Sequence, residues 1–271
     1  MAVSETCLYF IGMGLSGLKT CSLEAIEVLE NVDEIFIEKY TNFISEKTPH
    51  PFKQLRSNFS YLKREDLEEK DEQFLDRIQG RTIAILIPGD PFIATLHNSF
   101  RIAAIKRGYS CHVIHNTSII SAAASISGLS SYSFGRTVTC PFPKNASEVP
   151  YNIIQKNKSI DAHTLVLLDI NLLENKFLSV KEAIGILLNL EIEKKKAIFT
   201  PESRIVGLAR LGYNEAHVAY GTPNEVIDKY NWEKIGPPQA LIVCADSLYF
   251  AEEEALSILT SNYTSDKNGQ R

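Results

Sequence analysis

The chain has 271 residues, of which 44% are hydrophobic and 23% are charged, and its formal net charge is −5. This composition is typical of a globular protein large enough for two modest domains. The mild acidity argues against a nucleic-acid-binding protein, which usually carries a basic excess. No apolar run approaches the roughly 20 residues that a membrane helix needs.

The cysteines and the N-terminus indicate a reducing compartment. Five cysteines are scattered along the chain without a C-x-x-C pair, so they form neither a disulfide framework nor a zinc site. The apolar patch near the N-terminus is interrupted by glycines and has no basic region before it, unlike a signal peptide. We therefore expect a cytoplasmic protein with no bound metal and no nucleic-acid or membrane partner.

The first part of the chain alternates short apolar runs with helical patterns, which is typical of βαβ units. The expected elements, in order, are a strand at 8–11, a helix over 23–29, a strand at 34–38, a charged and solvated helix within 61–81, a strand at 83–87, a helix over 98–107 and a strand at 110–115. Gly108 stands where a glycine commonly ends a helix.

After residue 116 the chain becomes rich in Ser, Ala and Ile, which indicates a domain boundary. The patterns beyond it predict strands at 137–141, 163–170, 204–210, 216–220 and 240–243, and helices over 180–191 and 249–259. Thr222 to Glu225 combines a capping box with a proline at the first helical position, so a helix starts there. The prediction is an α/β protein with domains at 1–116 and 117–262 and a flexible tail at 263–271.

The segment IAILIPGDPFIATLH, residues 83–97, contains the turn that is most informative about a binding site. A buried strand ends abruptly at Pro88-Gly89-Asp90-Pro91 and delivers the carboxylate of Asp90 to its carboxyl end. The prolines restrict φ, and Gly89 lacks a Cβ, so a ligand can approach the main chain. Ligands of open α/β sheets bind at the carboxyl ends of strands, although an Asp-Pro turn without function is the commoner meaning of this dipeptide.

A second motif indicates a different class of protein, one that binds a dinucleotide. Residues 12–17, GMGLSG, fit G-x-G-x-x-G directly after a strand, and Glu38 ends the next strand at nearly the spacing of a dinucleotide-binding fingerprint. This suggests a nicotinamide-dependent oxidoreductase. Because the helical pattern does not begin right after Gly17, a glycine loop with another role is the favoured interpretation.

No catalytic or metal-binding constellation stands out. His112 and His115 are three residues apart in a predicted strand, so they point to opposite faces. The loops after strands offer mainly main-chain groups, small side chains, aliphatic side chains and one aspartate. Such a lining suits a neutral or cationic cofactor that carries adenine, and it lacks a phosphate cradle.

These loops resemble the diphthine synthase family, which belongs to the tetrapyrrole methylase-like class of S-adenosylmethionine-dependent methyltransferases. The resemblance rests on LYFIGMGL, GDPFIATLH, VIHNTSI, HTLVLLDI, and GLARLG followed by GPP before the last strand, in this order from Leu8 to Leu259. It implies two α/β domains with the cofactor cleft between them, and a homodimer. It also implies methylation of the 3-carboxy-3-aminopropyl-histidine of translation elongation factor 2, in diphthamide biosynthesis.

The resemblance also implies a set of contacts to S-adenosylmethionine and its product S-adenosylhomocysteine. They fall on Leu15, Asp90, Ile93, Ser118, Ile119, Leu168, Leu211 and Gln239. The family has a histidine at the position of Gln239, so we expect only a main-chain contact there. Asp90 is expected to bind and orient the cofactor, and no catalytic base is assigned.

Other interpretations stay open at this point. A methyltransferase acting on a carbon of a corrin or sirohaem precursor would use the same architecture, but it needs basic residues around a broad cleft. The oxidoreductase and a cofactor-binding scaffold without activity also remain. Within the family, the number of methyl groups added is open between a trimethylated amine and a further methyl ester.

Overall fold

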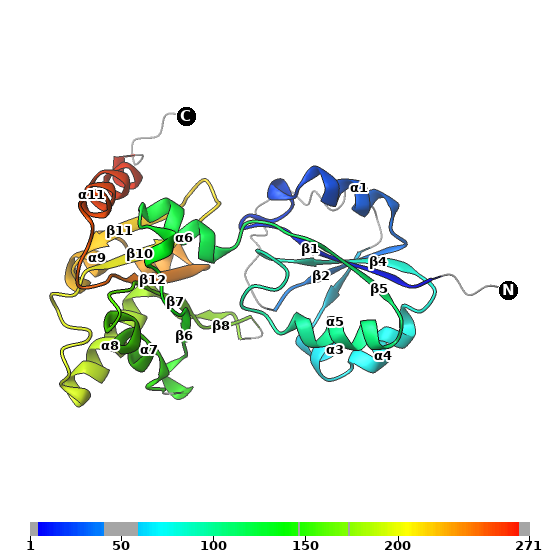
Figure 1. Ribbon diagram of the computed structural model, residues 1–271, viewed down its shortest axis with the longest axis horizontal. Coiled ribbons are helices and arrows are strands. Elements are labelled where there is room, and N and C mark those ends of the chain that lie inside the picture. The colour runs from blue at the N-terminus through cyan, green and yellow to red at the C-terminus, as the bar shows by residue number, and fades with distance from the viewer. Residues whose placement is uncertain (1–4, 41–58, 146, 173, 266–271) are drawn as a thin grey trace. The chain divides into compact units, whose positions relative to one another are not determined.

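The computed structural model describes residues 5–40, 59–145, 147–172 and 174–265 (Figure 1). The chain divides into two compact units, Met1–Ile119 and Ile120–Arg271, each built on its own sheet with helices packed against it. The α/β fold class expected from the sequence is therefore confirmed. The expected boundary after residue 116 lies close to the division between the units.

Unit 1 contains a fully parallel sheet with the strand order β3-β2-β4-β1-β5. Its strands are β1 (Cys7–Gly12), β2 (Glu34–Glu38), β3 (Phe59–Leu62), β4 (Thr82–Ile87) and β5 (Ser110–Ile114). In register, Gly12 lies opposite Ile87, and Ile11 lies opposite Ile114. The carboxyl ends of β1, β4 and β5 therefore meet at one edge of the sheet.

Helices cover both faces of this sheet (Figure 1). The 3₁₀ helix η1 (Gly17–Thr20) and α1 (Leu23–Asn31) follow β1, while α3 (Arg64–Glu68), α4 (Asp71–Arg77) and α5 (His97–Lys106) come later in the chain. Side chains alternate along a strand, so Phe10 packs into the cluster that contains Phe100 of α5, and Ile11 packs into the cluster that contains Leu29 of α1.

The charged helix expected within residues 61–81 is two short helices, and they are not only a solvated face. Leu67 of α3 and Phe74 and Leu75 of α4 are buried in the core of unit 1. Many charged residues lie between these apolar positions. The sequence pattern therefore did not indicate that the segment contributes to the core.

Unit 2 contains a mixed sheet with the order β11-β10-β12-β7-β6. Its strands are β6 (Val138–Cys140), β7 (Thr164–Leu168), β10 (Ile205–Ala209), β11 (His217–Gly221) and β12 (Gln239–Val243), and β8 (Ile170–Asn171) pairs with β9 (Lys176–Phe177) separately. Among the neighbouring strands that the structure describes in this sheet, β6 and β7 are parallel and the other pairs are antiparallel. The βαβ pattern expected along the chain holds for β6, α7 and β7, whereas β10 and β11 are antiparallel neighbours joined by a loop without a helix.

The helices of unit 2 are α6 (Ile119–Ser127), α7 (Val149–Lys158), α8 (Val180–Lys194), α9 (Pro223–Lys229), α10 (Trp232–Ile235) and α11 (Phe250–Ser265), with 3₁₀ turns η2 (Ser131–Ser133) and η3 (Pro143–Asn145). Figure 1 shows α7 and α8 on one side of the sheet and α6 and α11 on the other. Helix α11 reaches Ser265, so the predicted tail from residue 263 begins within a helix. Residues 266–271 of that tail lie outside the described residues.

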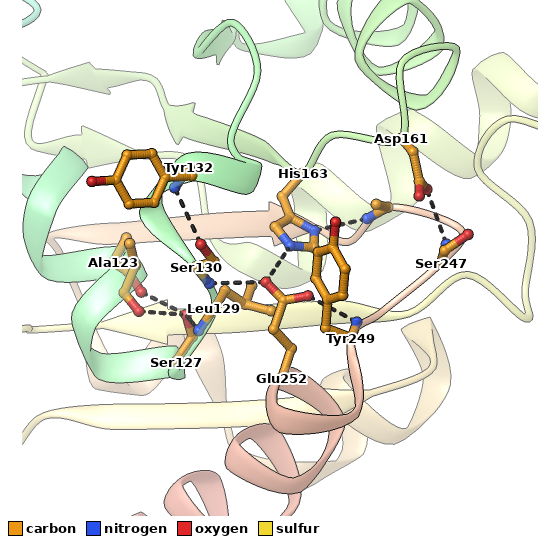
Figure 2. A network of polar contacts seen from close by, with 12 residues as sticks. Ala123, Ser127, Leu129, Ser130, Tyr132, Asp161, His163, Ser247, Tyr249 and Glu252 are labelled. Atoms are coloured by element: carbon orange, nitrogen blue, oxygen red, sulfur yellow. Dashed lines mark hydrogen bonds and ion pairs between the residues drawn. The ribbon is translucent and has the colours of Figure 1, made fainter.

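A buried histidine–glutamate pair joins three segments of unit 2 (Figure 2). The main-chain amide of Ala245 donates to His163 Nδ1 at 2.9 Å, so Nε2 carries the proton and donates to Glu252 at 3.3 Å. Glu252 also accepts hydrogen bonds from the amides of Ser130 (2.9 Å) and Tyr249 (3.1 Å). The first turn of α11 is thereby fixed against the chain between α6 and η2 and against the start of β7.

Two kinds of feature are missing from the described part of the chain. None of its helices is both long and apolar enough to cross a membrane. None of its groups of three or more His, Cys, Asp or Glu side chains is arranged to hold a metal ion.

Candidate functional site

Three loops at the carboxyl edge of the unit 1 sheet are hydrogen-bonded to one another. Gly14 and Gly89 form an isolated bridge, in which each main-chain amide donates to the other's carbonyl oxygen, at 3.1 and 2.8 Å. Asn116 Nδ2 donates to the carbonyl oxygens of Gly12 (2.9 Å) and Thr20 (2.8 Å). The loops after β1, β4 and β5 therefore form one connected structure.

Two of the glycines have different roles in this structure. A Cβ on Gly12 would lie 2.6 Å from the carbonyl oxygen of Gly89, so no side chain fits between the first and second loops. Gly89 has a φ of +76°, and a Cβ there would meet nothing within 4 Å. Gly12 thus permits the close approach of the loops. Gly89 is buried, and both polar groups of its main chain are bonded to Gly14, so its lack of a side chain serves the left-handed backbone of the second loop.

Asp90 connects the second loop to the third. Its carboxylate, which is almost fully buried, accepts hydrogen bonds from His115 Nδ1 at 2.8 Å, from the amide of Asn116 at 3.3 Å and from the amide of Phe92 at 3.3 Å. A carboxylate has roughly four acceptor positions, so most of them are used within the chain. Asp90 therefore fixes the geometry of both loops.

The remaining predicted contacts of unit 1 lie at this edge as well. Leu15 follows the Gly14 bridge and is half-buried, Ile93 is 38% exposed, and Ser118 and Ile119 follow the third loop. The loop segments GMGLSG, PGDPFIATL and HNTS contain no lysine or arginine. This lining fits an adenosyl group and a sulfonium and offers no cationic side chain for a pyrophosphate.

A buried cluster lies beside the second loop. Glu38, at the end of β2, is fully buried and accepts a hydrogen bond from the amide of Tyr40. His97 donates from Nδ1 to the carbonyl oxygen of Pro91 at 3.2 Å, so its Nε2 accepts from the Tyr40 hydroxyl at 3.2 Å. Burial lowers the pKa of His97, which keeps the ring neutral, and burial together with the charge of Glu38 raises the pKa of Tyr40.

These contacts leave the dinucleotide fingerprint without support. The first α-helix does not begin at Gly17: η1 intervenes, and α1 starts only after Ser22, whose hydroxyl caps it. The pyrophosphate of a dinucleotide would need a helix N-terminus at the glycine loop. The amide of Gly14 is bonded to Gly89, and Glu38 is buried and not placed to hold a ribose.

The three predicted contacts of unit 2 gather at one edge of its own sheet. Leu168 ends β7, Leu211 follows the end of β10, and Gln239 begins β12. Strand pairing places Gln239 opposite Ala209 and next to the β7 end, because Ala240 lies opposite Leu167. All three predicted contacts are buried.

The side chain of Gln239 is used inside unit 2. Its Oε1 accepts from the amide of Val180 at 2.8 Å, and its Nε2 donates to the carbonyl oxygens of Trp232 (2.7 Å) and Gly236 (3.1 Å). The amide group thereby fixes the start of α8 against the turn before β12. A contact to a ligand through the main chain of Gln239 stays a prediction.

Sequence reasoning did not identify the partners of Asp90. His115 and Asn116 were placed in the motif VIHNTSI, among the loops that follow strands, but neither residue was assigned a role. The rule that drew attention to Asp90, a polar side chain at the carboxyl end of a strand, applies to them equally. Applied to each strand in turn, it would have found them.

Comparison with known proteins identifies the family. The model of the tetrapyrrole (corrin/porphyrin) methylases matches residues 7–226. The diphthine synthase of Methanopyrus kandleri is 36% identical over 91% of this chain and 93% of its own, and that of Staphylothermus marinus is 38% identical over 88% of both. A crystal structure of a diphthine synthase covers 94% of this chain and 96% of its own, with a TM-score of 0.84 at 29% identity. The family expected from the sequence is confirmed: the chain belongs to the tetrapyrrole methylases and, within them, groups with the diphthine synthases.

Proposed function

We propose that this protein transfers methyl groups from S-adenosylmethionine to the 3-carboxy-3-aminopropyl-histidine of translation elongation factor 2, in diphthamide biosynthesis. The observation that carries the proposal is the likeness to diphthine synthases along nearly the whole chain. The connected loops at the edge of the unit 1 sheet support it, because they contain no lysine or arginine that would suit a phosphate-bearing cofactor.

The residues proposed to bind the cofactor are those named by the resemblance: Leu15, Asp90, Ile93, Ser118, Ile119, Leu168, Leu211 and, through its main chain, Gln239. S-adenosylmethionine supplies the methyl group on its sulfonium when bound. Leu15 and Ile93 shield apolar parts of the cofactor from water. Asp90 acts mainly by holding the second and third loops in place through its bonds to Phe92, His115 and Asn116.

The chain contributes alignment and exclusion of water to the reaction. Methyl transfer is an in-line displacement, in which the positive charge is lost from sulfur as the new bond forms, so a site sheltered from water favours the transition state. Rigid loops hold the donor at a fixed position relative to the acceptor. The bridge between Gly14 and Gly89 and the bonds from Asn116 supply that rigidity.

A methylase of a corrin or sirohaem precursor belongs to the same family and is the main alternative. Such a macrocycle carries several carboxylates, which call for lysine or arginine side chains near the reacting centre. Because the three loops contain neither residue, the protein substrate is the better match. The further expectations of a homodimer and of a cytoplasmic location rest on the resemblance and on the cysteine pattern, and sedimentation analysis would test the first.

The proposal is tested first by calorimetric titration with S-adenosylhomocysteine, with NADH as a parallel ligand. We expect only S-adenosylhomocysteine to bind, and Asp90→Ala to weaken that binding by about tenfold or more. The matched control is Asp228→Ala, at an exposed position on α9, which should leave the affinity unchanged. Elongation factor 2 carrying the modified histidine should then gain methyl mass with S-adenosylmethionine. Binding of NADH alone, or no mass gain on that acceptor, would overturn the proposal.

A further inference from the structure

A histidine and an aspartate face each other at the carboxyl edge of the unit 1 sheet. His115 follows β5, and its Nδ1 lies 2.8 Å from Oδ2 of Asp90, which follows β4. The side chain of Asp90 is only 11% exposed, whereas that of His115 is 74% exposed. The pair therefore consists of a fixed, buried carboxylate and an imidazole that faces outward.

The carboxylate determines which nitrogen of the ring carries the proton. An ionised carboxylate only accepts hydrogen bonds, so the bond to Asp90 requires the proton on Nδ1 and leaves the lone pair of the neutral ring on Nε2. No group in the described part of the chain bonds to Nε2 of His115. The amides of Phe92 and Asn116 hold the carboxylate in place, so the orientation of the ring is fixed as well.

This pair lies where the proposed ligand would bind. Strand β5 is the neighbour of β1, whose end carries the glycine loop, and Gly89, which is bonded to Gly14 of that loop, belongs to the same loop as Asp90. Ser118 and Ile119, two of the proposed cofactor contacts, follow His115 closely in the chain. An imidazole oriented by a carboxylate is the arrangement that proteins use to accept a proton from a nucleophile.

The proposed reaction needs such a group. An amine that is protonated has no lone pair for attack, so each methylation of an amine requires removal of one proton. We propose that His115 is the base that takes this proton and that Asp90 is its positioning residue; the inference rests on the proposed function.

The proton, the electron pair and the leaving group of this step are all accounted for by His115, the acceptor amine and S-adenosylmethionine. Nε2 of His115 accepts a proton from the ammonium group of the acceptor. The freed electron pair of nitrogen forms the N–C bond to the methyl group while the C–S bond breaks, and its electrons stay on sulfur in S-adenosylhomocysteine. The proton on His115 then passes to water, which the exposed ring can reach.

The other histidine at this edge is less suited to the role. His97 is 2% exposed, and both of its nitrogens are bonded, Nδ1 to the carbonyl oxygen of Pro91 and Nε2 to the hydroxyl of Tyr40. It therefore has neither a free lone pair nor access to an acceptor. The contacts of His97 fix the second loop. Of these two described histidines, His115 is the one that presents a ring nitrogen outward.

The first test compares His115→Ala with His112→Ala. His112 lies on the same strand, is also exposed and only stacks on Tyr9, so it is the matched control. Mass spectrometry of elongation factor 2 gives the rate at which methyl groups are added to the amine, and calorimetry gives the affinity for S-adenosylhomocysteine. We expect His115→Ala to lower the rate by about 10²- to 10⁴-fold with the affinity nearly unchanged, His112→Ala to resemble the wild type, and added imidazole to restore part of the lost rate.

The second test determines which ring nitrogen of His115 carries the proton, and it does not require methyl transfer. Nitrogen NMR of the neutral ring, assigned by its absence in His115→Ala, should show the Nδ1–H form in the wild type. In Asp90→Asn the new amide can donate to Nδ1, so the proton should move to Nε2 and the ring should cease to be a base. An Nε2–H form in the wild type would overturn the assignment.

The outcomes separate this inference from the function on which it rests. If neither S-adenosylhomocysteine binding nor methyl transfer is found in the wild type, the proposed function fails. If both are found and His115→Ala methylates the amine at the wild-type rate, only the role of His115 is wrong. If the rate falls but imidazole does not restore it and the affinity falls equally, His115 serves cofactor binding and the base assignment is overturned.

Discussion

Glu191 illustrates how a single polar side chain fixes a connection between elements. Near the end of α8, its carboxylate accepts hydrogen bonds from the hydroxyl of Tyr151 (2.7 Å) and from the amides of Ala197 (2.7 Å), Ile198 (2.7 Å) and Phe199 (3.0 Å). Burial by itself would raise the pKa of Glu191, but these donors outweigh it and lower the pKa to about 2. The ionised carboxylate therefore holds the segment after α8 against α7.

Replacing this carboxylate should cost stability in a pH-dependent way. We expect Glu191→Gln to lower the free energy of unfolding by about 1–3 kcal/mol at neutral pH, because hydrogen bonds to a charged group are lost. The pKa is lowered in the folded state, so the stabilisation is present above the unfolded value of about 4.3 and is lost as the pH falls toward 2. Denaturant unfolding at several pH values should show the wild type and the variant converging in acid.

The matched control for this variant is Glu193→Gln, which changes an exposed carboxylate on the same helix. It should leave the free energy of unfolding nearly unchanged at every pH. A constant difference between wild type and Glu191→Gln from neutral pH to acid would contradict the assigned role of the charge.

Gln239 offers a second prediction at this scale, because its side chain makes three internal hydrogen bonds. Gln239→Ala would leave the buried amide of Val180 without its partner, so we expect a loss of about 1–3 kcal/mol in the free energy of unfolding. The affinity for S-adenosylhomocysteine should fall by less than about tenfold, because the proposed contact is through the main chain. The exposed Gln73 on α4 supplies the control, as Gln73→Ala should change neither quantity.

A stable Gln239→Ala variant that no longer binds the ligand would show that the side chain itself contacts it. Chemical denaturation and calorimetric titration on the same preparation separate the two cases.

The sequence could identify single residues of the site but not their partners. Asp90 and Gly89 were predictable because they end a recognisable apolar strand. The bond between Asp90 and His115 joins residues 25 positions apart, and the strands that carry them, β4 and β5, are separated in the sheet by β1. That pairing follows from the strand order and from the absence of a side chain on Gly12, and neither is expressed in the local pattern.

At the scale of elements, the strands were the most predictable part of the fold. Strands of a parallel sheet are buried on both faces, so they appear as short, continuous apolar runs. Helix α7 was missed because two asparagines and an early proline weaken its helical pattern, and one of these asparagines, Asn157, is buried against Arg136 and Thr164. The antiparallel pairing in unit 2 depends on how the strands are connected, which the periodicity of a strand does not encode.

The contact between the ends of β1 and β4 gives a prediction at this scale. In Gly12→Ala the new Cβ would lie 2.6 Å from the carbonyl oxygen of Gly89, which is main chain and has little freedom to move. We expect the two loops to separate, with a loss of about 1–3 kcal/mol in stability and at least about a tenfold loss in affinity for S-adenosylhomocysteine. Thermal unfolding and calorimetry measure the two effects.

A glycine elsewhere provides the control. Gly185 lies inside α8, and a Cβ there would meet nothing within 4 Å, so Gly185→Ala should leave binding unchanged and raise stability by up to about 1 kcal/mol. If Gly12→Ala binds S-adenosylhomocysteine as tightly as the wild type, close packing of the two loops is not needed for the site.

At the scale of the whole molecule, the stabilising carboxylates are unevenly distributed. Among the described residues, every carboxyl group with a lowered pKa belongs to unit 2: Glu174, Glu191, Glu225, Glu233 and Glu252. The lowered values come from hydrogen bonds to main-chain amides and hydroxyls and from nearby lysines, which outweigh burial where burial opposes them.

Acid should therefore destabilise unit 2 before unit 1. Each of these groups stabilises the folded state above the unfolded pKa of about 4.3, and the contribution disappears as the pH falls through the folded value. The single tryptophan, Trp232, is fully buried in unit 2 and bonded to the carbonyl oxygen of Val226 at 2.8 Å, so its fluorescence reports on that unit alone. Far-ultraviolet circular dichroism reports on the helices of both units. On titration from pH 7 toward pH 2, we expect the Trp232 signal to change at a higher pH than the dichroism that remains from unit 1. Two transitions at the same pH would mean that the units unfold together. Loss of dichroism at a higher pH than the change in Trp232 fluorescence would mean that unit 1 is the less stable unit in acid.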